Sequence, residues 1–243
     1  LHDSIQTHSV CNLEHAVTAL LSFTALITMI FACLGGGAAI LYCLGLWHQQ
    51  NTIERAALSF AIGFGLIGWL FFWLGVGGWY SKEAAWIVCG LLTLALVPLL
   101  RTFISLTPIK LSVLEWLLVS LIAVAMAADF LEALAPPVEA DSLAYHFLLP
   151  KQFILEGRLV FVPRALDGAI PLLMQMTYVA ALLLGGTEDM ALTMWAFVCG
   201  WAPGFLLFAF SRRWLQRHWS LALLLLFQTL PAMLYGAGSG HVE

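Results

Sequence analysis

Charged side chains are scarce in this sequence. Only 10% of its 243 residues are Asp, Glu, Lys or Arg, whereas 62% are hydrophobic. A soluble domain has about 25% charged residues, and its outer helices need polar faces that are missing here. Apolar stretches near or above the roughly 18 residues that cross a bilayer recur along the chain. The composition therefore excludes an ordinary soluble domain and predicts an all-α, polytopic transmembrane protein.

The sequence also lacks the patterns of several common functional sites. Its basic residues are scattered, whereas nucleic-acid binding needs Lys and Arg clustered on one face. There is no CxxC pair, and four of the five cysteines lie in apolar segments, where Cys behaves as a small hydrophobe. The seven His residues fall at segment ends or in loops, so a haem held by a buried His pair is not expected. These absences assign no cofactor and argue against a nucleic-acid partner.

Six hydrophobic segments are long enough to span a bilayer. The expected spans are 16–46, 56–79, 84–100, 112–135, 190–211 and 219–236. Gly35–Gly37 marks a kink or a close-packing point in the first span, and Pro136-Pro137 ends the fourth. A GxGxxG sequence at Gly63, Gly65 and Gly68 lacks the preceding strand that a dinucleotide site requires. We interpret it as a helix-packing surface.

A seventh apolar stretch, 168–186, is only just long enough to cross. Cytoplasmic loops are enriched in Lys and Arg. If 168–186 crosses, either seven of the ten basic residues lie outside or the long loop 136–167 lies inside. If it does not cross, six basic residues lie inside, including the three arginines at 212–217. We favour the second alternative, which places the N-terminus and the loop 136–189 outside.

Polar residues that could take part in catalysis or binding are concentrated between 129 and 167. Asp129 and Glu132 lie near the end of the fourth span, three residues apart and therefore on one helical face. Carboxylates at membrane depth are costly and often functional, although both could instead reach the membrane interface. Asp141 precedes an expected amphipathic helix at 142–156, where it could equally be a helix N-cap.

A cap does not account for the residues that follow Asp141. Tyr145 and His146 lie about one turn further on. Three cations come next, at Lys151, Arg158 and Arg164. An acid, an aromatic pair and cations beside a bilayer suit a lipid phosphate held by the cations and an acceptor oriented by the carboxylate.

The segment PPVEADSLAYHFLLPKQFILEGRLV resembles the first extracytoplasmic loop of the GT-C glycosyltransferases, membrane enzymes that use polyprenyl-phosphate sugars. The similarity is closest to bacterial members with a PP…D-x-L-x-Y-H…P-K…G-R pattern, and it covers about 112–243. It implies a GT-C-like membrane module at 112–243, with interfacial helices in its first extracytoplasmic loop at 136–189. Residues 1–111 would form three additional transmembrane helices.

By this resemblance, Asp141 corresponds to the catalytic aspartate of the family and Tyr145 to its accompanying aromatic residue. Glu243 stands where the family usually has a second acid, normally Asp. The implied reaction is an inverting sugar transfer from a polyprenyl phosphate to an acceptor at the outer face of a bacterial inner membrane. Asp141 and Glu243 would form the catalytic pair. The expected substrate-binding residues are Tyr145, His146, Lys151, Arg158 and Arg164. A divalent metal between the two acids is weakly supported, because oxygen-ligand sites usually have more carboxylates.

The chain departs from the family pattern in two respects. Members usually continue for several more spans, and the helices at 1–111 have no assigned counterpart. We therefore expect the N-terminal part of such an enzyme or, alternatively, a non-catalytic transmembrane subunit of a larger complex. The expected partners are membrane lipid, a polyprenyl-phosphate sugar and other membrane subunits. A small transporter ranks last, because paired interrupted helices with convergent charges are lacking in the sequence.

Overall fold

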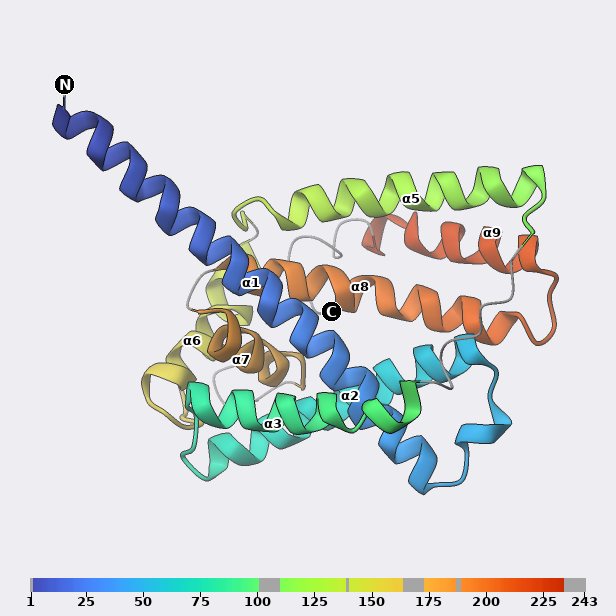
Figure 1. The fold of residues 1–243 in the computed structure, drawn as a ribbon, viewed down its shortest axis with the longest axis horizontal. Helices are drawn as coiled ribbons and strands as arrows, with labels where there is room; N and C mark the ends of the chain where they lie inside the picture. Colours follow the sequence, from blue (N-terminus) through green and yellow to red (C-terminus); the bar gives the residue numbers. More distant parts are fainter. Residues whose placement is uncertain (1, 101–109, 139, 164–172, 187–188, 234–243) are drawn as a thin grey trace.

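A computed structural model describes residues 2–100, 110–138, 140–163, 173–186 and 189–233. In this part of the chain the regular elements are helices, without a strand, which confirms the all-α expectation. Figure 1 shows the long helices α1 (His2–Cys43), α2 (Thr52–Val76), α3 (Lys82–Leu94), α5 (Val113–Ala133) and α8 (Asp189–Ser211). The shorter elements are η1 (Trp47–Gln49), η2 (Val97–Leu99), η3 (Ser142–His146), α6 (Leu148–Leu155), α7 (Leu173–Gly185) and α9 (Arg217–Gln228).

Five helical segments are long and apolar enough to cross a membrane. They are Ala16–Cys43, Thr52–Val76, Lys82–Leu99, Val113–Ala133 and Asp189–Ser211. These segments overlap the first five predicted spans. The fold of the described residues is therefore that of a helical membrane protein.

The sixth predicted span, 219–236, is not one continuous helix. α9 has 12 residues and ends at Gln228, with Thr229 and Leu230 in a turn. Pro231 explains the break, because it lacks an N–H and disfavours helical backbone at the residue before it. A helix of this length covers about 18 Å, well short of the roughly 30 Å hydrocarbon core. Whether the segment 219–236 crosses the membrane therefore stays a prediction, and residues from 234 onward lie outside the described ranges.

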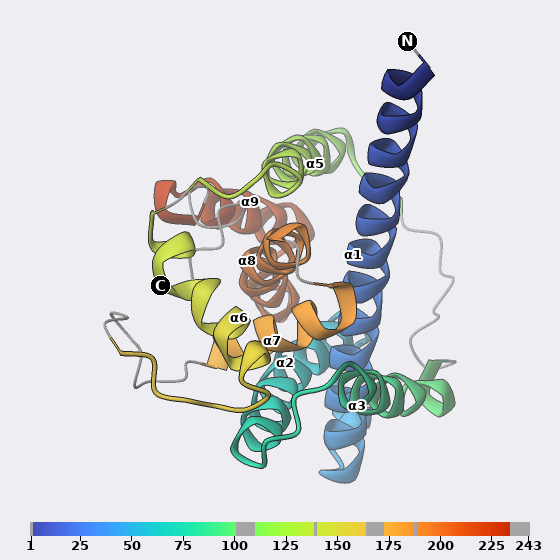
Figure 2. The same cartoon turned by 90° about the vertical axis from the view of Figure 1, so that its left-hand side faces the viewer.

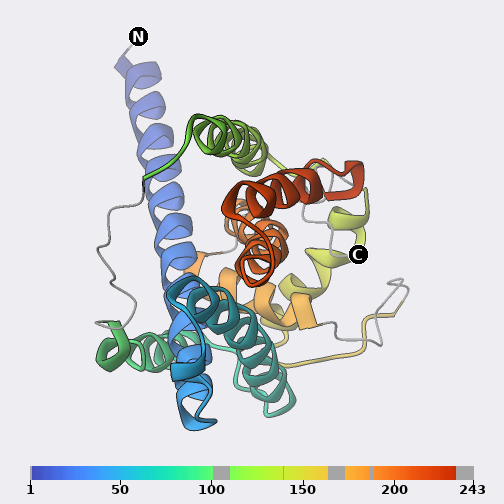
Figure 3. The same ribbon diagram turned by 90° about the vertical axis from the view of Figure 1, so that its right-hand side faces the viewer.

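The helices form two groups that meet at α7 and α8. α1 packs against α2 and α3, while α5 and α9 pack against each other and against α8. Figure 1 shows α5, α9 and α8 nearly parallel, with α1 crossing the bundle obliquely and its N-terminal turns extending beyond the other helices. Figure 3, viewed from the right, shows α5, α8 and α9 on one side and α1, α2 and α3 on the other. α8 contacts both groups, because it also packs against α1 and α2.

Glycines allow α1 and α2 to pack in backbone contact. A Cβ atom on Gly37 would overlap the carbonyl oxygen of Ser59, and one on Gly63 would overlap that of Cys33. α1 continues as a helix through Gly35–Gly37, so these residues act as a close-packing point. The packing interpretation of the GxGxxG sequence is confirmed at Gly63 and at Gly68, where a Cβ would overlap Leu173. It was wrong for Gly65, which has nothing within 4 Å.

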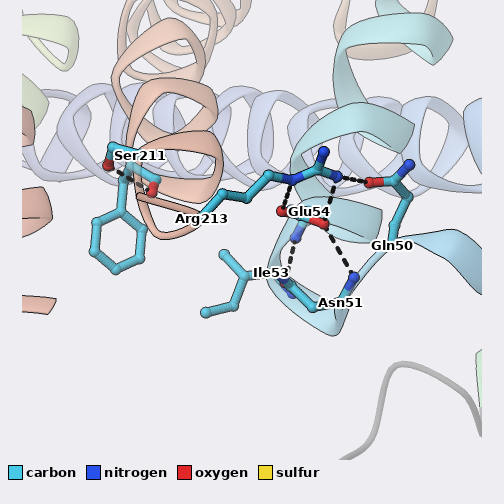
Figure 4. Close-up of polar contacts among 7 residues, drawn as sticks. Gln50, Asn51, Ile53, Glu54, Ser211 and Arg213 are labelled. Carbon is cyan, nitrogen blue, oxygen red and sulfur yellow. Dashed lines mark hydrogen bonds and ion pairs between the residues drawn. The ribbon is translucent and has the colours of Figure 1, made fainter. Parts of the chain in front are cut away.

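Two arginines where α8 connects to α9 form ion pairs with the first turns of α2 and α5. Arg213 Nε lies 2.6 Å from Glu54 Oε1, and its guanidinium also donates to Gln50 (Figure 4). Arg217 Nε lies 2.6 Å from Glu115 Oε1 at the start of α5. Each Glu also belongs to a capping box, so it binds a helix N-terminus and an arginine at the same time. Hydrogen bonding to Glu54 raises the pKa of Arg213.

These ion pairs place the 212–217 turn at the same end of the bundle as the first turns of α2 and α5. The non-crossing alternative for 168–186 requires this arrangement. α7, the described part of that stretch, has 13 residues, or about 20 Å of helix. Its residues from Gln175 to Gly185 are all buried, among α1, α2, α6 and α8. Which end of the bundle faces the outside stays a prediction.

Candidate functional site

The last turns of α5 are fixed to α8 by two hydrogen bonds. Trp201 Nε1 donates to Asp129 Oδ2 over 2.9 Å, and Thr193 Oγ1 donates to the carbonyl of Ala133 over 2.6 Å. Asp129 is only 5% exposed, whereas Glu132 lies on the exposed side. The two acids that the sequence places on one helical face therefore differ in environment. Asp129 has a defined partner inside the bundle, Trp201, which the sequence did not predict.

A π-helical turn, η3, follows directly after Asp141. The Phe147 N–H donates to the carbonyl of Ser142 over 2.8 Å, which is the i to i+5 spacing of a π-helix. Asp141 itself is exposed and makes no side-chain capping bond, so it does not act as the simple N-cap. π-helical turns are rare and occur frequently at functional sites. The segment that follows Asp141 thus has an unusual backbone conformation.

Tyr145 and His146 point into the protein rather than toward the surface with Asp141. Tyr145 is 3% exposed and His146 is 1% exposed, with their ring centroids 4.1 Å apart. Tyr145 belongs to the same core cluster as Phe147, whose ring meets that of Tyr178 edge-on at 5.2 Å. Phe147, the residue after the π-turn, therefore packs against α7. In this conformation the buried rings of Tyr145 and His146 have a structural role in the segment after α5.

Lys151 forms an ion pair that the sequence did not predict. Its Nζ lies 2.5 Å from Asp189 Oδ1, and both side chains are about one-third exposed. Asp189 is in the first turn of α8, where a carboxylate also complements the helix dipole. The feature of the sequence that could have indicated this pair is the acid at the start of the fifth span. The pair ties α6 to α8 and neutralises one of the predicted phosphate-binding cations.

The Gly157-Arg158 pair of the motif has a clear role in the backbone. Gly157 has φ +67°, and the N–H groups of Gly157 and Arg158 donate to the carbonyls of Ile154 and Phe153. This is a Schellman motif, which stops α6. The chain then runs beside the α2–α3 turn, where Tyr80 N–H donates to the Gly157 carbonyl. Arg158 is exposed at this turn.

Two of the predicted site residues, Arg164 and Glu243, lie outside the described residues. The approach of Glu243 to Asp141 and a metal ion between them therefore stay predictions. Within the described ranges, no three His, Cys, Asp or Glu side chains are grouped closely enough to hold a metal ion.

Figure 2 shows α6 and α7 lying close together, with α2 next to α7. Of the predicted site residues that are described, Asp141 and Arg158 are exposed, Lys151 is partly exposed in its ion pair, and Tyr145 and His146 are buried. No protein-family model, curated protein or solved structure matches this chain. The class defined by the fold is a helical membrane protein with a folded segment after its fourth spanning helix.

Proposed function

We propose that this chain is the N-terminal part of an inverting glycosyltransferase, which moves a sugar from a polyprenyl phosphate to an acceptor at the outer membrane face. The observation that carries the proposal is Asp141. Its carboxylate is exposed, has no capping role, and directly precedes a π-helical turn at the end of the bundle. The proposal also rests on the resemblance of this segment to the GT-C loop.

Asp141 would act as the general base. The acceptor oxygen would attack the anomeric carbon as the bond to the lipid phosphate breaks, and Asp141 would take the acceptor proton. A single displacement of this kind inverts the anomeric configuration. Arg158 is a better candidate than Lys151 for the departing phosphate, because Lys151 is already bound to Asp189.

The first test is Asp141→Asn in membranes that contain the full-length gene product. Asn keeps the size of Asp but cannot accept the proton, so sugar transfer should fall by about 10²–10⁴-fold. Transfer of a radiolabelled sugar from polyprenyl phosphate measures the effect, with protein level and melting temperature recorded in parallel. Glu156→Gln, which changes an exposed acid at the end of α6, is the matched control and should leave transfer unchanged. Wild-type transfer by Asp141→Asn would contradict the assignment.

A non-catalytic transmembrane subunit is the second candidate. The burial of Tyr145 and His146 and the pairing of Lys151 with Asp189 favour it, because these residues already have structural roles. For a subunit, Asp141→Asn should be silent in every assay of the complex. Breaking the α6–α8 ion pair with Asp189→Asn should instead reduce the yield of assembled complex.

A further inference from the structure

An apolar cavity of about 590 Å³ lies where the two helix groups diverge. Its walls come from α1, α2, α5, α8 and α9, and all of its lining residues are apolar. Representative lining residues are Leu34, Ala57, Phe60, Ile122, Ala202 and Leu224. The α5–α9 pair and the α1–α2 pair face each other across this space, with α8 contacting both.

The cavity occupies the half of the bundle nearest to Arg213. Ile53 in the first turn of α2 and Phe208 in the last turn of α8 line one end of it. Its wall also reaches the molecular surface, since Ile53 is 45% exposed and Phe205 is 42% exposed. A long, thin apolar group could therefore enter from the membrane.

Water is an unsuitable occupant of this space. A volume of 590 Å³ corresponds to about 20 molecules at roughly 30 Å³ each. A buried water needs two to four polar partners, and the walls offer none from their lining side chains. Among spanning helices, the surrounding solvent is hydrocarbon, so a lipid chain is the natural filler.

The charged residues beside the cavity favour a lipid with an anionic headgroup. The described residues at this end include five cations, at Arg55, Lys110, Arg212, Arg213 and Arg217, against the two carboxylates of Glu54 and Glu115. Arg213 and Arg217 are balanced by those carboxylates. The remaining excess of positive charge attracts an anionic headgroup at the membrane surface.

We propose that this cavity holds one acyl chain of an anionic glycerophospholipid from the leaflet at the Arg213 end. The phosphate would lie near Arg212, and the chain would fill the space between the α1–α2 and α5–α9 pairs. The site is at the opposite end of the bundle from Asp141, so it does not depend on the proposed transferase activity. Its role is to hold the two helix groups together.

The test uses the purified full chain in nanodiscs of 30% phosphatidylglycerol and 70% phosphatidylcholine. A trace of phosphatidylglycerol carrying a diazirine in one acyl chain serves as the probe, and crosslinked peptides are mapped by mass spectrometry. Ala57→Phe and Ala202→Phe each place a ring in the cavity. Displacing about two methylenes of chain contact should reduce crosslinking at cavity residues about tenfold. Gly65→Phe, on the same helix as Ala57 but facing open space, is the control and should leave crosslinking unchanged.

The headgroup is tested separately with matched diazirine probes of phosphatidylcholine and polyprenyl phosphate. Phosphatidylglycerol should crosslink more strongly than phosphatidylcholine, and Arg212→Gln should remove that preference. Melting curves establish that each variant is folded. If only one of Ala57→Phe and Ala202→Phe folds, that variant alone is enough for the test. Equal crosslinking in Ala57→Phe and Gly65→Phe, or no headgroup preference, would overturn the proposal. Preferential labelling of the same residues by polyprenyl phosphate would overturn the phospholipid assignment.

Discussion

Asp129 is a carboxylate inside a helix of spanning length, where an unpaired polar group is costly. Its partner is the indole of Trp201, 72 residues later in the chain, at 2.9 Å. Trp201 also packs with Ile122 in the small core between α5, α8 and α9. Asp129 therefore contributes to the joining of α5 and α8 whether or not it has a chemical role.

Two substitutions separate the structural role of Asp129 from a chemical one. Asp129→Leu leaves the Trp201 N–H buried without an acceptor, which should cost about 1–3 kcal/mol of stability. Asp129→Asn keeps an acceptor oxygen of similar position and should cost much less. Thermal or denaturant unfolding in detergent measures both. If Asp129→Asn is as unstable as Asp129→Leu, the negative charge rather than the hydrogen bond is what the fold requires.

At the scale of the elements, small residues decide how closely helices approach. α1 and α2 meet at Gly37 and Gly63, where neither helix leaves room for a side chain. Gly65 belongs to the same GxGxxG sequence and the same helix, yet it faces open space. The pattern of glycines in the sequence therefore identifies the packing surface only in part, because the helix rotation selects which of them face the partner.

This difference gives a matched pair of variants. Gly63→Leu forces the α1 and α2 backbones apart, and overpacking of this kind typically costs about 1–3 kcal/mol. The melting temperature should fall by at least about 2 °C for a chain of this length. Gly65→Leu adds the same side chain to open space and should leave the melting temperature unchanged. An equal fall for both variants would show that the effect does not come from the α1–α2 contact.

At the scale of the whole molecule, the ion pairs of Arg213 and Arg217 bring the α8–α9 turn to the starts of α2 and α5. α6 and the start of α8 lie at the other end, joined by Lys151 and Asp189. Most described basic residues are therefore at the Arg213 end. The tendency of cytoplasmic loops to be basic predicts that this end lies inside.

Cysteine accessibility in intact cells tests this assignment. In a background without the natural cysteines, Glu156→Cys should react with a membrane-impermeant maleimide added outside, since Glu156 is exposed at the end of α6. Gln216→Cys, in the exposed α8–α9 turn, should react only after the membrane is opened. Labelling of both positions from the same side would contradict the placement of the two ends.

The sequence predicted the elements of the candidate site better than their contacts. The break after the fourth span and the helix that contains Lys151 follow from Pro136-Pro137 and from local hydrophobic pattern. The inward direction of Tyr145 and His146 does not, because both residues lie within a π-turn, a rare backbone conformation that the sequence did not predict. The pairing of Lys151 with Asp189 also required the tertiary structure, since the two residues are 38 positions apart, although the acid at the start of the fifth span was visible in the sequence.

By itself, the sequence determined that this is a helical membrane protein and where five of its long helices lie. Scarce charge and long apolar segments suffice for that, because in a bilayer each helix satisfies its own backbone hydrogen bonds. The tertiary structure decided which glycines pack, which carboxylates are buried and which cations are already paired. It also decided that α7 is enclosed among other helices. These properties depend on how helices distant in sequence rotate and pack against one another, and no local pattern encodes that.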